Sequence, residues 1–234
     1  MEDGFTAVSK GGRKSRRKNK YVVQEKTVDD YLAILAEKRD KLARSKFMEK
    51  LREIFEEFQL PEIKSIRCLA LGPPSDTAST MPAMYQLALL QILAEQLDVP
   101  ETNVSVWDPV FSDMDKTILE KSGYLVAEEF PSSVELDTCL FYMPHAPLSL
   151  TNDTLASLAQ AKTSIILGNL LTTYDTRVSP RDLEQKYPYL NTAMKDMFQR
   201  KSWSFQQIPD NLSKHEHFFQ AVNDLALHYR SLNV

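Results

Sequence analysis

The sequence predicts an α/β protein with a Rossmann-like, doubly wound and mostly parallel sheet that carries helices on both faces. Short apolar segments alternate along the chain with longer segments of helical periodicity. The apolar segments are nearly continuous, which is typical of parallel strands that are covered on both faces. Because crossovers between parallel strands are right-handed, the doubly wound strand order is the expected one.

Six strands are predicted, over 65–71, 103–107, 124–127, 137–143, 164–167 and 202–208. The helices between them are predicted to begin near Pro82, capped by Ser79 or Thr80, and to cover 112–122, 151–161, 180–198 with a break before Pro188, and 215–232. Upstream, Thr27 and Asp30 form a capping-box pattern. This pattern predicts the start of one or two amphipathic helices over 28–59. The second of them must pack on the α/β domain, because its aromatic face would otherwise be exposed.

Composition and length bound the organisation of the chain. Its 234 residues are 43% hydrophobic and 26% charged, which is typical of a globular protein. We expect a basic tail over 1–26, a helical segment over 27–60 and an α/β domain over 61–234. No run of about 18 apolar residues occurs, and no apolar core follows Met1. A membrane span and a signal peptide are therefore not expected.

The charge is divided unevenly between the tail and the body. Residues 1–20 carry a net charge of +5, whereas the whole chain carries −4 and the remainder therefore −9. A segment this basic favours either a solvated arm or a nuclear-import or nucleic-acid tether. We expect nucleic acid to bind only through it, because the body is acidic. The candidate signal consists of Lys10, Arg13, Lys14, Arg16, Arg17, Lys18 and Lys20.

The two cysteines, Cys68 and Cys139, lie inside apolar strands that should be neighbours in the sheet. We interpret them as buried reduced thiols, which is typical of the cytosol or nucleus. They are too far apart in the sequence to form a recognisable zinc site, and no metal site is expected.

Polar residues follow four of the predicted strands. They are Gly72 with Ser75, Asp108 with Pro109, His145, and Asn169. In a doubly wound sheet the carboxyl ends of the strands meet at one edge, where ligands bind at the switch point. The sequence therefore predicts one rim that holds these residues.

The first of these loops is unlike a dinucleotide-binding loop. It has one glycine where that fingerprint needs three, and Pro73 and Pro74 remove backbone donors. Asp108 stands where an acid would bind a cofactor ribose, in the looser manner of an S-adenosylmethionine site. It is equally well explained as a turn or cap before Pro109.

His145 is flanked by Pro144 and, after Ala146, by Pro147. Three roles are open for it: a general base at the rim, a ligand to haem or a metal, or a hydrogen-bonded structural residue. Neither a GxSxG elbow nor an HExxH or Walker motif is present, which disfavours a standard hydrolase or kinase.

A set of short motifs in a fixed order adds a family resemblance. The motifs are Gly72, YQLA at 85–88, DPVF at 108–111 with Asp115 and Gly123, FYMPH at 141–145, Asn152, and LGN at 167–169 with Tyr174. Over about residues 64–200 the chain resembles the Sensitivity to Red Light Reduced (SRR1-like) family. The loop GPPSDTAST at 72–80 departs from the family, whose members often carry an arginine there.

The resemblance implies a regulatory protein without an established reaction, in the cytoplasm and nucleus. Family members are linked to circadian-clock and light-signalling control and to haem biosynthesis. The family has no agreed catalytic residues, so the motifs transfer only as candidate pocket or fold residues: Gly72, Ser75, Tyr85, Gln86, Asp108, Pro109, His145, Asn152, Asn169 and Tyr174. For Tyr85 and Gln86 a purely structural role is the other interpretation.

Two functions from different classes therefore compete. The first is a regulatory protein that binds a protein partner or a small ligand, with haem among the candidates and the cofactor otherwise unknown. The alternative is a small-molecule enzyme resembling an S-adenosylmethionine-dependent methyltransferase. In it Asp108 would bind the cofactor ribose, and His145 or Asn169 would lie near the reaction.

Overall fold

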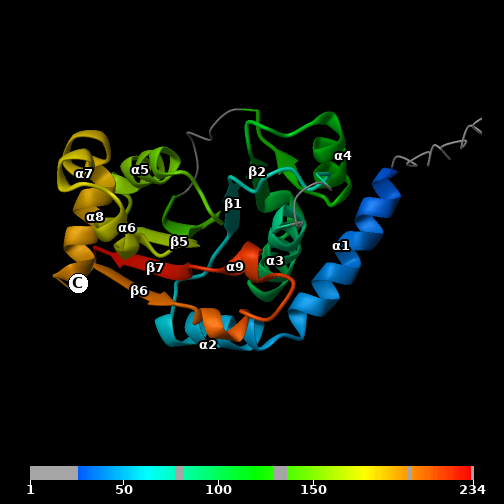
Figure 1. The fold of residues 1–234 in the computed structure, drawn as a ribbon, viewed down its shortest axis with the longest axis horizontal. Coiled ribbons are helices and arrows are strands. Elements are labelled where there is room, and N and C mark those ends of the chain that lie inside the picture. The colour runs from blue at the N-terminus through cyan, green and yellow to red at the C-terminus, as the bar shows by residue number, and fades with distance from the viewer. Residues whose placement is uncertain (1–25, 77–81, 129–135, 200–201, 233–234) are drawn as a thin grey trace, which may run out of the picture.

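The structure, a computed structural model, describes residues 26–76, 82–128, 136–199 and 202–232. The basic residues at 10–20 and the proposed caps Ser79 and Thr80 lie outside these ranges. A seven-stranded sheet in the order β3-β2-β1-β4-β5-β7-β6 organises the fold (Figure 1). Its strands are β1 (Ser65–Leu69), β2 (Val104–Trp107), β3 (Leu125–Val126), β4 (Cys139–Met143), β5 (Thr163–Asn169), β6 (Trp203–Gln207) and β7 (Leu225–Ser231).

The first five strands are parallel, which confirms the predicted Rossmann-like arrangement. The chain runs outward from β1 to β2 and β3, then returns to pair β4 with the other edge of β1. The register sets Cys68 beside Tyr142 and Ser65 beside Cys139, so the two cysteine strands are neighbours as expected. The switch point of the sheet therefore lies between β1 and β4.

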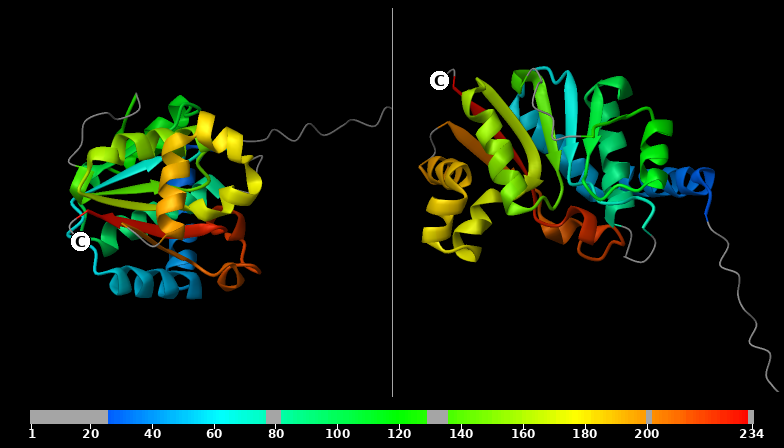
Figure 2. Two further views of the ribbon diagram at one scale, coloured as in Figure 1. Left: turned by 90° about the vertical axis from the view of Figure 1, so that its left-hand side faces the viewer. Right: turned by 90° about the horizontal axis from the view of Figure 1, so that it is seen from above.

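Helices cover both faces of the sheet (Figure 2). One face packs against α3 (Pro82–Gln96), α4 (Asp113–Lys121) and α9 (Phe219–Val222), and the other against α5 (Leu148–Ser157), α7 (Pro180–Lys186) and α8 (Pro188–Phe198). The one-turn helix α6 (Tyr174–Arg177) precedes α7. In β4 all five residues are buried, with Leu140 and Tyr142 facing the first core cluster and Phe141 and Met143 the second. This double burial explains the continuous apolar strand segments in the sequence.

The N-terminal segment forms two helices on the side of the first face: α1 (Val28–Ala43), which packs against α3 and α4, and α2 (Lys46–Phe58). The predicted capping box is present, because the amide of Asp30 donates to Thr27 Oγ1 at 3.2 Å and the amide of Thr27 to Asp30 Oδ2 at 2.8 Å. Phe47 in α2 packs edge-on against Phe218, with 6.2 Å between the ring centroids. The apolar face of α2 is thus covered, as its periodicity predicted.

The predicted C-terminal helix over 215–232 is wrong. Only α9 is helical there, and 225–231 form strand β7, antiparallel between β5 and β6. Leu, Ala and His are compatible with a helix, but local propensity is a weak preference that tertiary pairing overrides. Here the open edge of β5 requires a hydrogen-bonding partner, and β7 pairs with it over seven residues. The neighbouring strand predicted over 202–208 is confirmed as β6.

The strand β7 buries His228 completely. Its Nε2 accepts from the amide of Leu171 at 3.3 Å, and no described group pairs with its Nδ1. Desolvation by burial lowers the pKa of His228 from 6.5 to about 4. Between these pH values the unfolded chain therefore binds a proton that the folded chain does not, so the free energy of unfolding falls as the pH falls.

We expect His228→Gln to make stability less sensitive to acid, because the amide oxygen can still accept from Leu171 but does not titrate. Between pH 7 and pH 4.5 the variant should lose about 2 kcal/mol less unfolding free energy than the parent chain. Urea unfolding at a series of pH values measures this difference. His217→Gln, at an exposed position, is the control, and an acid dependence shared by parent and both variants would contradict the assignment.

Candidate functional site

The carboxyl ends of β1, β2, β4 and β5 lie along one edge of the sheet, because these strands are parallel neighbours. The topology thus brings the loops that hold the predicted strand-end residues to the same edge. Their hydrogen bonds divide the residues into two groups, one at β1 and β2 and the other at β4 and β5.

The first group is organised by the carboxylate of Asp108. Its Oδ2 accepts from the amide of Gly72 at 2.8 Å, and its Oδ1 accepts from the amide of Val110 at 3.0 Å. Gly72 has φ +74°, a left-handed conformation that favours glycine and turns the loop toward Asp108. Asp108 therefore joins the loops after β1 and β2, and the following Pro109 is exposed.

A second carboxylate, Asp115, extends this group and was not among the predicted pocket residues. It is fully buried, and its Oδ1 accepts from the amide of Ser75 at 2.7 Å. Its Oδ2 accepts from the amide and hydroxyl of Ser112, the N-cap residue of α4, and so completes a capping box. The carbonyl of Ser75 accepts from the hydroxyl of Tyr31 in α1 at 3.0 Å. In the sequence, Asp115 stood out only as one of the residues that carry the family resemblance.

The second group is organised by Asn169. Its side-chain oxygen accepts from the amide of His145 at 3.0 Å, and its Nδ2 donates to the hydroxyl of Tyr174 at 3.1 Å. His145 has φ +54°, a conformation that is uncommon for a residue with a side chain. The Asn169 contact holds the backbone of the loop after β4 in this conformation.

The ring of His145 is exposed at the rim and lies near α9. Partial desolvation lowers its pKa, while hydrogen bonding to the backbone of Gln220 and Ala221 and the charge of Asp224 act in the opposite direction. The imidazole is therefore neutral at pH 7, the form that can accept a proton or bind a metal.

The other candidate residues form contacts between helices. Asn152 accepts from the amides of Tyr189 and Leu190, at 3.1 and 3.4 Å, and so caps the start of α8. Gln86 is buried and donates to the carbonyl of Ala221 at 3.4 Å. Tyr85 is buried against Phe218, with 5.8 Å between ring centroids. Ala221 also lies beside the ring of His145, so Gln86 and the rim histidine contact the same part of α9.

Neither thiol offers a reactive site. Cys68 and Cys139 are both free and buried, and burial raises the pKa of each.

Within the described ranges, no group of three or more His, Cys, Asp or Glu residues is placed to hold a metal ion. In the same part of the chain, no helix is long and apolar enough to cross a membrane.

The sheet and its strand-end loops thus define a Rossmann-like α/β protein. The profile of the SRR1 domain matches residues 42–229, and this chain belongs to the SRR1 domain family. The Mus musculus SRR1-like protein is 32% identical over 131 residues, which cover 53% of this chain and 52% of that protein. The chain therefore spans about half the length of this curated relative.

A solved structure is also similar in part. The crystal structure of a Corynebacterium glutamicum protein aligns with 89% of this chain and 99% of its own, with 13% identity and a TM-score of 0.39.

We expect Asp108→Ala to destabilise the fold, because it leaves the amides of Gly72 and Val110 without their acceptor. Loss of these two bonds at a half-buried position should lower the free energy of unfolding by about 1–2 kcal/mol, measured by urea unfolding. Glu62→Ala, at an exposed loop position, should leave stability within about 0.5 kcal/mol. Equal stability of the parent and Asp108→Ala would show that Asp108 does not brace the loops.

Proposed function

We propose that this chain is a non-catalytic regulatory protein of the SRR1 domain family, which acts by binding a partner or small ligand. The clock-linked and haem-linked control associated with the resemblance is its proposed setting. The observation that carries this proposal is the engagement of the strand-end polar groups with the protein's own loops.

The contacts at the rim support binding rather than catalysis. Both carboxylate oxygens of Asp108 accept hydrogen bonds from backbone amides. The side chain of Asn169 is hydrogen-bonded to the amide of His145 and to the hydroxyl of Tyr174. A catalytic acid, base or ribose ligand needs an oxygen or nitrogen that is directed at the substrate. Here these atoms fix loop conformation instead, and they leave the His145 ring as the exposed titratable group among them.

The enzymatic alternative resembles an S-adenosylmethionine-dependent methyltransferase. Its support is the position of Asp108 at the end of β2, next to the switch point of the sheet. In that function Asp108 would have to exchange its amide partners for a ribose hydroxyl, and His145 would act as the base.

A thermal-shift experiment distinguishes the two functions, since a ligand that binds only the folded state raises the Tm. We expect neither S-adenosylmethionine nor NAD to raise the Tm of the full chain at millimolar concentration. Haemin is included because the neutral imidazole of His145 is a form that can coordinate the haem iron. The control is His145→Asn, which tolerates a positive φ and should remove any haemin Soret band that depends on His145. A saturable shift with S-adenosylmethionine that Asp108→Asn abolishes would overturn the non-catalytic proposal.

The basic residues at 10–20 bear on where in the cell the protein is located. We propose that they act as a nuclear-import signal, so that the protein is present in both cytoplasm and nucleus. Their support is the sequence alone, where seven Lys and Arg residues occur within eleven positions.

Deleting residues 10–20 should lower the nuclear fraction of the protein, measured by imaging in cells that lack the native chain. In the same cells, clock-reporter period and haem content measure whether regulation requires nuclear entry. Fusing an unrelated import signal to the deleted chain is the control and should restore the nuclear fraction. An unchanged nuclear fraction after the deletion would reject the import role.

A further inference from the structure

A groove lies at the opposite edge of the sheet, away from the strand-end loops. It has a volume of about 610 Å³ and is bounded by α1, by α3, and by the segments that lead into β2 and β3. The helix α1 forms one wall and is held in place by the buried Leu35 and Leu42. Most of α1 precedes the SRR1 domain match, which begins at residue 42. The groove is thus made between the family domain and the helix before it.

The charges that line the groove do not balance. Its two cations are already paired, Arg39 with Glu95 and Lys121 with Asp29, the latter at 3.3 Å. Three further carboxylates line it, those of Asp40, Asp98 and Glu101. None of these three has an ion-pair partner within the described ranges. The groove therefore presents a surplus of negative charge.

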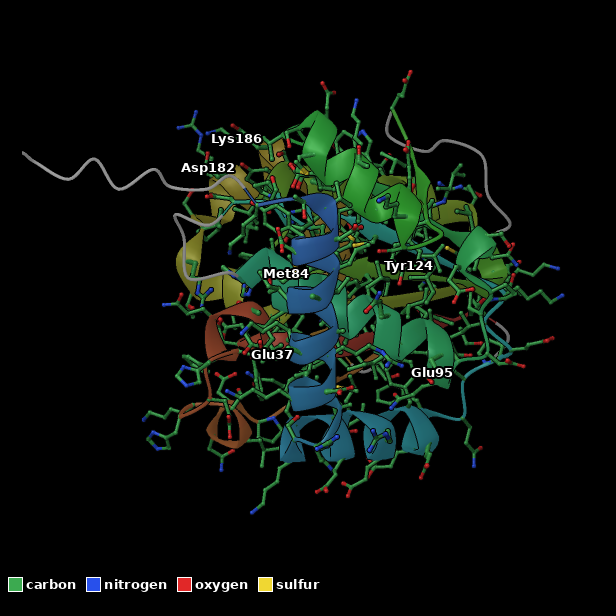
Figure 3. The ribbon with its side chains drawn as sticks, turned by 90° about the vertical axis from the view of Figure 1, so that its right-hand side faces the viewer. Glu37, Met84, Glu95, Tyr124, Asp182 and Lys186 are labelled. Carbon is green, nitrogen blue, oxygen red and sulfur yellow. The ribbon has the colours of Figure 1, made fainter. Side chains whose placement is uncertain are left out.

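Tyr124 supplies an independent indication of a ligand. Its side chain is only 4% exposed, yet it lines the groove, and its hydroxyl has no hydrogen-bond partner among the described residues. Burial raises the pKa of Tyr124, Cys68 and Glu101 raise it further, and Arg39 lowers it. Figure 3 shows Tyr124 and Glu95 on the same side of α1. The hydroxyl oxygen is not fully enclosed by the protein and opens onto the groove, where a ligand can reach it.

The backbone holds Glu101 beside Tyr124. A Cβ added at Gly123, which has φ +87°, would lie 3.0 Å from the Cβ of Glu101. The chain before Tyr124 therefore packs directly against the stem of Glu101. A larger residue at 123 would push this carboxylate away from the hydroxyl.

Apolar side chains also line the groove, among them Leu32, Leu35 and Val99. A complementary ligand has methylene segments for these side chains and several positive charges for the carboxylates. We propose that the groove binds an aliphatic polyamine, with its ammonium groups against Asp40, Asp98 and Glu101 and one of them donating to the Tyr124 hydroxyl. This function is separate from the strand-end loops and does not depend on them.

Isothermal titration of the full chain with spermidine at 150 mM salt tests the proposal. We expect saturable binding of one spermidine per chain. The double variant Asp98→Asn with Glu101→Gln should bind about tenfold more weakly, because it removes two ligand charges and keeps the side-chain shapes. The control is Glu216→Gln, at an exposed position in the loop before α9, which removes a charge elsewhere and should bind as the parent chain does.

Tyr124→Phe separates a ligand contact from a structural role. Because the hydroxyl has no partner in the folded protein, its removal should leave the urea-unfolding free energy unchanged within about 0.5 kcal/mol. Spermidine binding should nevertheless weaken measurably. Three results would each overturn the proposal: no saturable binding, an equal loss of affinity in Glu216→Gln, or equally tight binding of magnesium chloride at the same residues, which would indicate an inorganic cation site.

Discussion

The fold depends on burying the central strands β1 and β4 on both faces. Every residue of β4 is buried, and alternate side chains enter two separate core clusters. Neither face can therefore be left without helices, since exposing either would return apolar side chains to water. This requirement places α3 and α4 on one side and α5, α7 and α8 on the other, and it fixes the edge at which the functional loops emerge.

Polar contacts inside this core connect the last segment of the chain to the first helix of the Rossmann-like unit. The hydroxyl of Tyr142 donates to the carbonyl of Gln86 at 3.2 Å, and the side chain of Gln86 donates to the carbonyl of Ala221. A strand, a helix and the C-terminal segment are thus joined through one buried glutamine. Such a group stabilises only this arrangement, because in another packing it would be buried without partners.

Local patterns in the sequence predicted the parallel strands well and the C-terminal segment poorly. The strands around Cys68 and Cys139 are mostly apolar, and glycine or proline follows each of the predicted segments, so their type and order followed from the chain alone. The segment around His228 contains residues that suit a helix equally well, and it became a strand only because β5 offered an open edge. Long-range pairing of this kind leaves little trace in local periodicity.

The candidate site shows the same division. Topology was enough to predict that Asp108, His145 and Asn169 would lie along one edge. It could not predict that Asp108 and Asn169 would form hydrogen bonds within the protein's own loops, because these depend on the loop conformations at Gly72 and His145. The groove beside α1 left no motif at all, since its walls come from three separated segments.

The hydrogen bond from Tyr31 to Ser75 connects α1 to a second region of the protein, outside the groove. Ser75 belongs to the loop that Asp108 and Asp115 hold at the far edge of the sheet. The same helix thus takes part in two separate places: its side chains form a wall of the groove, and its tyrosine anchors the turn at Ser75. Displacement of α1 would therefore alter the groove and the turn together.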